Sequence, residues 1–151
     1  MSERPSPPSR ADYRQFETVD TRWSDNDMYG HVNNAAFYRF FDTAVNRYLI
    51  EAGVLDPTSS DVIGLVVETG CQFFAPASFP ERLDIGIRVA KLGTSSVRYE
   101  LGVFGQRDQP GEDLAKAAGF FTHVYVDAET RRPVPLPTAL RDLLAASLTA
   151  L

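Results

Sequence analysis

The feature that most constrains the fold is a long amphipathic segment over residues 34–52. Its apolar side chains recur every three or four residues, as on one face of an α-helix. Asn33 or Asn34 can cap its start, and Gly53 can end it in the left-handed conformation. A helix of this length extends about 28 Å. Its wide aromatic face needs a broad apolar surface, which a curved β-sheet would supply. The apolar residues are Phe37, Phe40, Phe41, Ala44, Val45, Tyr48, Leu49 and Ala52.

Five β-strands are predicted in addition to this helix. Residues 83–89 alternate apolar and polar side chains, which is typical of a half-buried strand. The other strands are expected over residues 13–24, 62–76, 97–103 and 114–126. The last of them carries apolar residues on both faces, so it should lie inside the sheet. Its small side chains would let a helix approach closely, and these are Ala115, Ala117, Ala118 and Gly119.

Turn-forming residues separate the later strands. Gly93-Thr94 predicts a hairpin turn, and Gln109-Pro110-Gly111-Glu112 fits a type II turn. Such short turns imply antiparallel strands, although the pattern does not determine their order in the sheet. Thr138 is expected to cap a short C-terminal helix. One sheet with a helix laid on one face indicates an α+β fold.

Length, charge and cysteine content limit the class of protein. The chain has 151 residues, which predicts one domain over residues 12–151 after a disordered tail over residues 1–11. Its net charge of −5 provides no general basic field for nucleic acid. No signal peptide or membrane-spanning run is recognisable. The single cysteine, Cys71, excludes an intramolecular disulfide, so we expect a cytoplasmic protein. Because no apolar run is long enough to span a bilayer, no membrane partner is expected.

Candidate chemistry is concentrated just ahead of the long helix. Residues 22–34 hold two carboxylates, Asp25 and Asp27, together with Gly30 and His31. Free backbone N–H groups at a helix N-terminus can bind developing negative charge. In an extended segment Asp25 and Asp27 point to opposite sides, so one can serve structure and the other chemistry. From their spacing alone, the interpretation as two turn formers is favoured, since Asp bonds readily to nearby backbone groups in turns.

Other catalytic arrangements have less support in the sequence. Asp25, Asp27 and His31 match no strong metal spacing, so neither a metal nor another cofactor is expected. His31 could act as a general base or orient the turn. His123 lies in a strand and is interpreted as a packed, hydrogen-bonded residue. Cys71 has no visible activating partner. The sequence contains no nucleophile elbow, phosphate loop or dinucleotide-binding glycine pattern.

The run Trp23-Ser-Asp25-Asn-Asp27-Met-Tyr-Gly30-His31-Val32-Asn33-Asn34, followed by Phe37-Tyr38-Arg39-Phe40-Phe41-Asp42, resembles the 4-hydroxybenzoyl-CoA thioesterase family of hotdog-fold proteins. The resemblance covers residues 13–137. It continues in Phe73-Phe74-Ala-Pro, in Gly93-Thr-Ser-Ser-Val-Arg-Tyr-Glu and in His123-Val-Tyr-Val-Asp127. The resemblance implies a five-stranded antiparallel sheet wrapped around one long central helix. It also implies a homodimer or homotetramer (a dimer of dimers), with active sites at the subunit interface and metal-free hydrolysis of acyl-CoA thioesters.

Residue roles follow from the same resemblance. The catalytic aspartate of the family matches Asp27, as nucleophile or general base. The backbone N–H that polarises the thioester carbonyl matches Asn34, and the turn glycine matches Gly30, with His31 in support. The 4-hydroxybenzoyl enzyme itself lacks the His-Val-Asn-Asn run. The chain is therefore more similar to the general acyl-CoA thioesterase branch, and an aromatic substrate is not implied.

Substrate contacts and the class of activity stay open at this point. Tyr38, Phe73 and Phe74 are candidate pocket walls, but they could equally be core or interface residues. Three basic residues could bind the CoA phosphates or be ordinary solvated strand charges, and these are Arg88, Lys91 and Arg98. The main alternative function is a non-catalytic hotdog module that binds an acyl thioester or another apolar ligand. The acyl preference is not determined.

Overall fold

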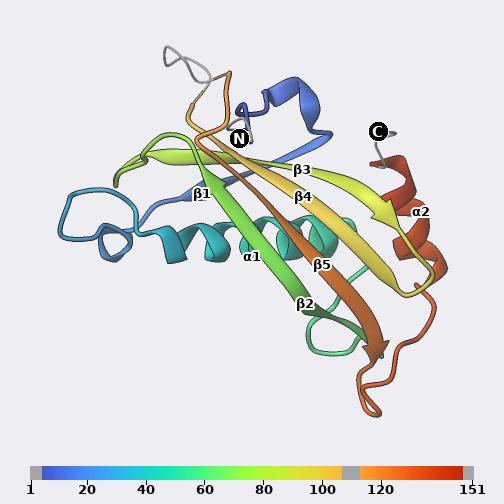
Figure 1. The fold of residues 1–151 in the computed structure, drawn as a ribbon. Coiled ribbons are helices and arrows are strands. Elements are labelled where there is room, and N and C mark those ends of the chain that lie inside the picture. Colours follow the sequence, from blue (N-terminus) through green and yellow to red (C-terminus); the bar gives the residue numbers. More distant parts are fainter. Residues whose placement is uncertain (1–4, 107–112, 148–151) are drawn as a thin grey trace.

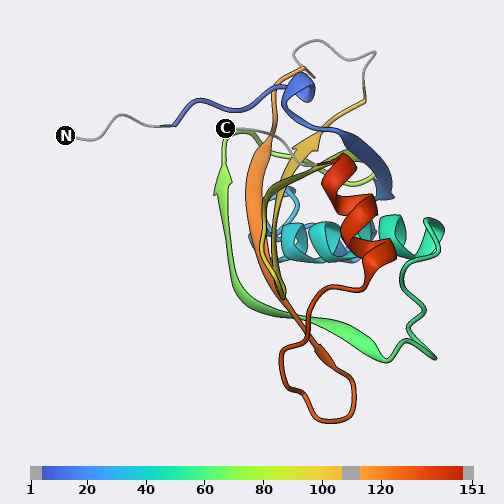
Figure 2. The same ribbon diagram turned by 90° about the vertical axis from the view of Figure 1, so that its right-hand side faces the viewer.

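The structure is a computed structural model, and it describes residues 5–106 and 113–147. A five-stranded antiparallel sheet curls around one long helix (Figure 1). Figure 2 shows this helix inside the curve of the sheet. The α+β hotdog architecture implied by the family resemblance is confirmed. The elements are β1 (Gln15–Asp20), α1 (Asn34–Glu51), β2 (Val62–Phe73), β3 (Arg82–Leu92), β4 (Ser96–Phe104), β5 (Ala117–Asp127) and α2 (Thr138–Ala146).

The strand order, which the sequence pattern left open, is β1-β3-β4-β5-β2. All neighbouring strands are antiparallel. β5 lies between β4 and β2, so the prediction that it lies inside the sheet is confirmed. β2 is an outer strand, and its middle section over residues 65–69 is exposed. α2 packs against β3.

The helix α1 begins at the predicted residue and ends one residue early. Six of its eight predicted apolar residues are buried, whereas Tyr48 is half-buried and Ala52 is exposed. Asn33 is its N-cap, and the Asn33 side chain accepts a hydrogen bond from the Ala35 N–H (2.9 Å). Gly53, just beyond the C-terminal end, has a φ of +75°. Gly119 of β5 lies against Phe41, because a Cβ on Gly119 would come within 2.6 Å of the Phe41 ring. This confirms that small residues of β5 let the helix approach. The buried residues of α1 are Phe37, Phe40, Phe41, Ala44, Val45 and Leu49.

Several element boundaries differ from the sequence prediction. β1 ends at Asp20 rather than at residue 24, because residues 23–25 form a short 3-10 turn. β5 begins at Ala117, and Thr138 is the first residue of α2 rather than its cap. The predicted type II turn over residues 109–112 lies outside the described residues.

The described part of the expected disordered tail makes specific contacts with the folded body. The Ala115 N–H donates to the Pro8 carbonyl (2.8 Å), and Arg10 forms an ion pair with Asp84 of β3 (3.0 Å). The Arg10 side chain is largely buried and lies over the ring of Phe104. These partners are distant in sequence, so local composition could not indicate them.

Candidate active site

The loop between β1 and α1 is a closed turn. The Asp27 N–H donates to the His31 carbonyl (2.8 Å), and the Gly30 N–H donates to the Asp27 carbonyl (3.1 Å). Asn26 and Val32 form an isolated antiparallel bridge. Gly30 has a φ of +80°, which glycine adopts without a steric penalty. The turn therefore reverses the chain toward α1. Asp27 lies where the two ends of the turn are joined by hydrogen bonds.

A hollow of about 400 Å³ opens at the N-terminal end of α1. Asp27 and Asn34 line it on one side, and Phe73 and Phe74 line it from the end of β2. The Phe37 ring stands edge-on to the Phe73 ring, with 5.3 Å between centroids. The hollow thus combines a carboxylate with aromatic walls. Its other lining residues are Tyr29, His31, Val32, Ala75, Pro76 and Ala77.

Hydrogen-bond donors and acceptors are arranged around this hollow. Asn34 is the first residue of α1. Within the described part of the chain its backbone N–H has no acceptor, as is usual for a first-turn N–H. One carboxylate oxygen of Asp27 accepts the Tyr29 N–H (2.9 Å), which fixes the side chain in the turn. The hollow is therefore lined both by a held carboxylate and by a residue with a free helix N-terminal donor.

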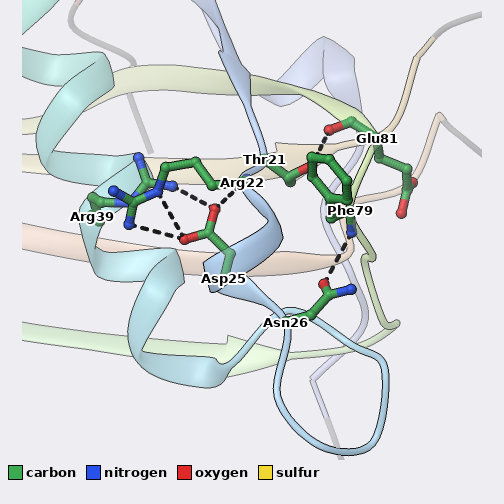
Figure 3. A network of polar contacts seen from close by, with 7 residues as sticks. All are labelled: Thr21, Arg22, Asp25, Asn26, Arg39, Phe79 and Glu81. Carbon is green, nitrogen blue, oxygen red and sulfur yellow. Dashed lines mark hydrogen bonds and ion pairs between the residues drawn. The ribbon is translucent and has the colours of Figure 1, made fainter.

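Asp25 has a structural position, as Figure 3 shows. The residue is 3% exposed, and its carboxylate accepts the Arg22 backbone N–H (2.7 Å). It also forms ion pairs with Arg22 (3.1 Å) and with Arg39 of α1 (2.7 Å). The Asp25 carbonyl accepts the N–H of Asn33, the helix cap (2.8 Å). Asp25 thus ties the loop to the start of the helix.

The charge state of Asp25 follows from these contacts. Burial raises the pKa of the carboxyl group, but hydrogen bonds from Arg22 and the positive charges of Arg39 and Arg22 outweigh burial and lower it. The ionised carboxylate is therefore the form that this network stabilises. Both carboxylate oxygens of Asp25 accept hydrogen bonds from guanidinium groups. Asp25 therefore does not share a metal ion with Asp27. Over residues 5–106 and 113–147, no group of three or more His, Cys, Asp or Glu side chains is arranged to hold a metal ion.

Residues 21–144 match the model of a protein family described as the thioesterase-like superfamily. The chain belongs to the thioesterase-like superfamily. It is 53% identical to the PA5185 protein from Pseudomonas aeruginosa strain PAO1, with a TM-score of 0.90, and the match covers 97% of this chain and 99% of that one. No curated protein matches the chain significantly.

More distant solved structures share the fold of this thioesterase-like chain. A 1,4-dihydroxy-2-naphthoyl-CoA thioesterase from Synechocystis is 18% identical, with a TM-score of 0.75 and coverage of 86% of this chain and 94% of that one. A gentisyl-coenzyme A thioesterase is 24% identical, with a TM-score of 0.72 and coverage of 86% and 99%. At these identities the likeness concerns the fold.

The predicted basic residues lie apart from Asp27 in this thioesterase-like chain. Arg88 and Arg98 line a second hollow, of about 470 Å³, on the face of the sheet opposite α1. Glu100 pairs with Arg88 (2.8 Å) and with Arg98 (3.4 Å). Lys91 lines neither hollow. Phe74 lines both, so the two hollows meet at its side chain.

The structure therefore gathers some predicted site residues and separates others. Around the first hollow it brings together Asp27, His31, Asn34, Phe73 and Phe74. Gly30 shapes the adjoining turn, as expected. Tyr38 instead packs edge-on against Phe41 (6.4 Å between centroids) and does not line this hollow.

Sequence reasoning assigned Phe37 only to the buried face of the helix. Its position three residues after Asn34, in the first turn of α1, was the signal that it also borders the site. Ala75 and Pro76 were quoted only as part of the family resemblance and Ala77 was not singled out, so their place at the hollow was missed as well.

His123 and Cys71 differ in how well they match their predictions. His123 is packed among aromatic rings, but its Nε2 has no hydrogen-bond partner in the described part of the chain, so the expected hydrogen bond is absent. Burial lowers the pKa of His123 to about 4. Burial raises the pKa of the half-buried Cys71 thiol to about 12, which agrees with an inert thiol. No helix in the described residues is long and apolar enough to cross a membrane.

Proposed function

We propose that this protein hydrolyses acyl-CoA thioesters to a free carboxylic acid and CoA. The observation that carries the proposal is that Asp27 and Asn34, the first residue of α1, line one hollow with aromatic walls. Membership of the thioesterase-like superfamily supports thioester chemistry. Among solved structures with the same fold are thioesterases named for gentisyl-CoA and 1,4-dihydroxy-2-naphthoyl-CoA.

The reaction requires stabilisation of charge on the thioester oxygen. Attack on the carbonyl carbon turns this oxygen into an oxyanion, and one preorganised N–H donor contributes about 3–4 kcal/mol to its stabilisation. In the proposed mechanism the Asn34 N–H is that donor, helped by the positive end of the α1 dipole. The turn 26–32 holds Asp27 on the same hollow, where its carboxylate can reach the carbonyl carbon or a water molecule.

Two routes lead from Asp27 to the same products. As a nucleophile, the Asp27 carboxylate attacks the carbonyl carbon, expels the CoA thiolate and leaves a mixed anhydride, which water then hydrolyses. As a general base, it takes a proton from a water molecule that attacks the carbon directly. His31, exposed at the rim of the hollow, supports the turn through its carbonyl bond to Asp27.

The two hollows suggest how CoA is held. Phe37, Phe73 and Phe74 form apolar walls near the thioester. The pantetheine arm then passes Phe74 toward the second hollow, where Arg88 and Arg98 meet the CoA phosphates. Glu100 neutralises part of their charge, so the hollow carries a net positive charge from these three side chains. Exposed Lys91, on the same strand as Arg88, is a further phosphate contact.

Self-association through β2 is part of the proposal. An uncovered sheet edge presents unpaired N–H and C=O groups and invites pairing with another chain. β2 is twice as long as the other outer strand, β1. Its middle exposes Leu65 (37%), Val66 (46%) and Val67 (61%). Antiparallel pairing of two copies of β2 about a two-fold axis would cover these residues and join the two sheets.

A hydrolysis screen tests the proposed function. The purified protein is offered acyl-CoAs with short, medium, long and aromatic acyl groups, and thiol release is followed. Asp27→Asn and Asp27→Ala are expected to fold normally and to lose most turnover. Asp61→Asn, a change at an exposed aspartate, is the matched control and should keep full activity. Unchanged turnover by Asp27→Ala would contradict the mechanism, and tight acyl-CoA binding without any turnover would favour the non-catalytic binding module.

A further inference from the structure

The short segment after β2 contacts both the Asp27 hollow and the turn that carries Asp27. Residues 74–77 line the hollow, and residues 77–79 form hydrogen bonds with the turn 26–32. Because the two segments are distant in the sequence, this contact arises only in the folded chain. One segment therefore both walls the hollow and supports the turn.

Two of these hydrogen bonds support the second half of the turn. The Ser78 hydroxyl donates to the Gly30 carbonyl (2.9 Å). The Val32 N–H donates to the Ala77 carbonyl (2.7 Å). Residues 28–31 are exposed, so apolar packing contributes little to the position of this part of the chain. Its place beside the hollow therefore depends on hydrogen bonds.

The third hydrogen bond supports the turn ahead of Asp27. The Phe79 N–H donates to the side-chain oxygen of Asn26 (3.0 Å), as Figure 3 shows. The Phe79 ring also stands edge-on to that of Trp23, with 5.9 Å between centroids. Asn26 immediately precedes Asp27, and the other two hydrogen bonds lie after it. The turn is thus held on both sides of the carboxylate.

The supporting segment is itself fixed to the sheet. The Glu81 side chain accepts the Ser78 N–H (2.6 Å), and the Glu81 carbonyl accepts the hydroxyl and the N–H of Thr21, just after β1. Lys116, just before β5, donates to the Pro76 carbonyl (3.3 Å) and pairs with Glu81 (3.7 Å). The Lys116 side chain is 14% exposed. The segment is therefore a firm support, anchored at two strands.

We propose that Ser78 and Asn26 are positioning residues, which hold Asp27 at the distance from the thioester that the reaction requires. This inference rests on the proposed thioesterase function. Neither side chain lines the Asp27 hollow, so both act through the turn and touch no substrate. A displacement of about 1 Å at a reacting group can cost about 100-fold in rate. Loss of one of the three hydrogen bonds loosens the turn without releasing it, so we expect a smaller loss.

A serine variant tests this role with the best substrate of the hydrolysis screen. Ser78→Ala should lower kcat by about tenfold, with less than about a twofold change in the Kd of the matching S-alkyl-CoA thioether, which lacks the carbonyl and is not hydrolysed. Ser78→Thr keeps a hydroxyl group and should restore most of the lost kcat. Asn26→Ala removes the bond on the other side of Asp27 and should lower kcat by a similar factor, again without loss of thioether binding.

Ser59→Ala is the matched control. Its hydroxyl donates to Asp56 (2.7 Å) in the loop beyond the C-terminal end of α1, and this end lies about 27 Å from the end that borders the hollow. The control also loses a serine hydroxyl that bonds within a loop, yet it should keep the wild-type kcat.

Hydrogen exchange gives a readout that needs no turnover. Under native conditions Ser78→Ala should speed deuterium uptake by at least about twofold in peptides that cover residues 26–32, with no change in those that cover residues 56–61. Unchanged uptake in the turn or a wild-type kcat overturns the inference. A fall in kcat with an equal loss of thioether binding, or faster uptake along the whole chain, assigns Ser78 a general structural role and overturns it as well. If the wild-type protein hydrolyses no acyl-CoA, the proposed function itself fails, and the exchange data show separately whether Ser78 holds the turn.

Discussion

The ion pairs of Asp25 lead to a prediction whose size can be estimated from the structure. Asp25→Asn keeps the shape of the side chain but removes the charge that faces Arg22 and Arg39. The Asp25 side chain is 2% exposed, and removal of one partner from a buried ion pair costs about 3–5 kcal/mol. The Arg39 side chain is 33% exposed, so water replaces part of the lost interaction. We therefore expect Asp25→Asn to lower the free energy of unfolding by about 2–3 kcal/mol.

Urea denaturation followed by tyrosine and tryptophan fluorescence measures this loss. For a chain of this size about 2–3 kcal/mol corresponds to a fall of roughly 4–12 °C in Tm. The pH dependence provides an independent check. Because the folded-state pKa of Asp25 is lowered, its stabilisation is present above the unfolded pKa and is lost as the pH falls below about 4. Asp25→Asn should flatten this part of the acid limb.

Activity separates the role of Asp25 from that of Asp27. Asp25→Asn loosens the loop that carries Asp27, so hydrolysis should fall together with stability. Asp27→Asn should abolish hydrolysis at nearly unchanged stability, because Asp27 lies at the hollow outside the ion-pair network. The reasoning is refuted if Asp25→Asn unfolds within about 0.5 kcal/mol of the wild type and keeps the wild-type acid limb.

Four further outcomes follow from the structure. Burial lowers the pKa of His123 from 6.5 to about 4 in the folded state, so protonation of His123 alone should lower the free energy of unfolding by about 3 kcal/mol between pH 6.5 and pH 4. His123→Phe should lack this part of the loss when urea denaturation is compared at the two pH values. Gly119→Ala places a Cβ 2.6 Å from the Phe41 ring and should cost about 1–3 kcal/mol in the same assay. Arg98→Gln should raise KM for acyl-CoA but not for the matching acyl-pantetheine, which lacks the nucleotide phosphates. Val67→Lys should shift the molar mass in light scattering toward that of a monomer, and an unchanged mass would place the interface elsewhere.

Features that depend on residues close together in the sequence were predictable from the sequence. The limits of α1 agree with the predicted 34–52 segment to within one residue at its end, because capping and left-handed termination depend on Asn33 and Gly53 alone. A structural role for one of the two aspartates was one of the possibilities that the sequence left open, and the ion pairs of Asp25 agree with it, while the catalytic role of Asp27 stays a prediction. The family resemblance added Asn34 and the expectation of a wrapped sheet.

Features that depend on distant residues were not predictable. Arg10 was assigned to a disordered tail, since its partner Asp84 belongs to β3. Arg88 and Arg98 were named as possible phosphate contacts, but the sequence did not show that they line one hollow, because this depends on the pairing of β3 with β4. His123 was expected to be hydrogen-bonded, but its Nε2 has no partner among the described residues. The sequence does not show which polar groups lie close to a buried ring in the folded protein.

The sequence by itself determined the elements, the capping of α1 and the polar turn that carries Asp27, because these arise from interactions among residues close together in the chain. Tertiary structure alone decided the strand order, the tie between Asp25 and Arg39, and the hydrogen bonds that join residues 77–79 to the turn. Each of these depends on which distant surfaces meet once the apolar face of α1 is buried. The free energy gained when apolar surface is buried is roughly proportional to the buried area and has no preferred direction. It therefore drives collapse without specifying these pairings.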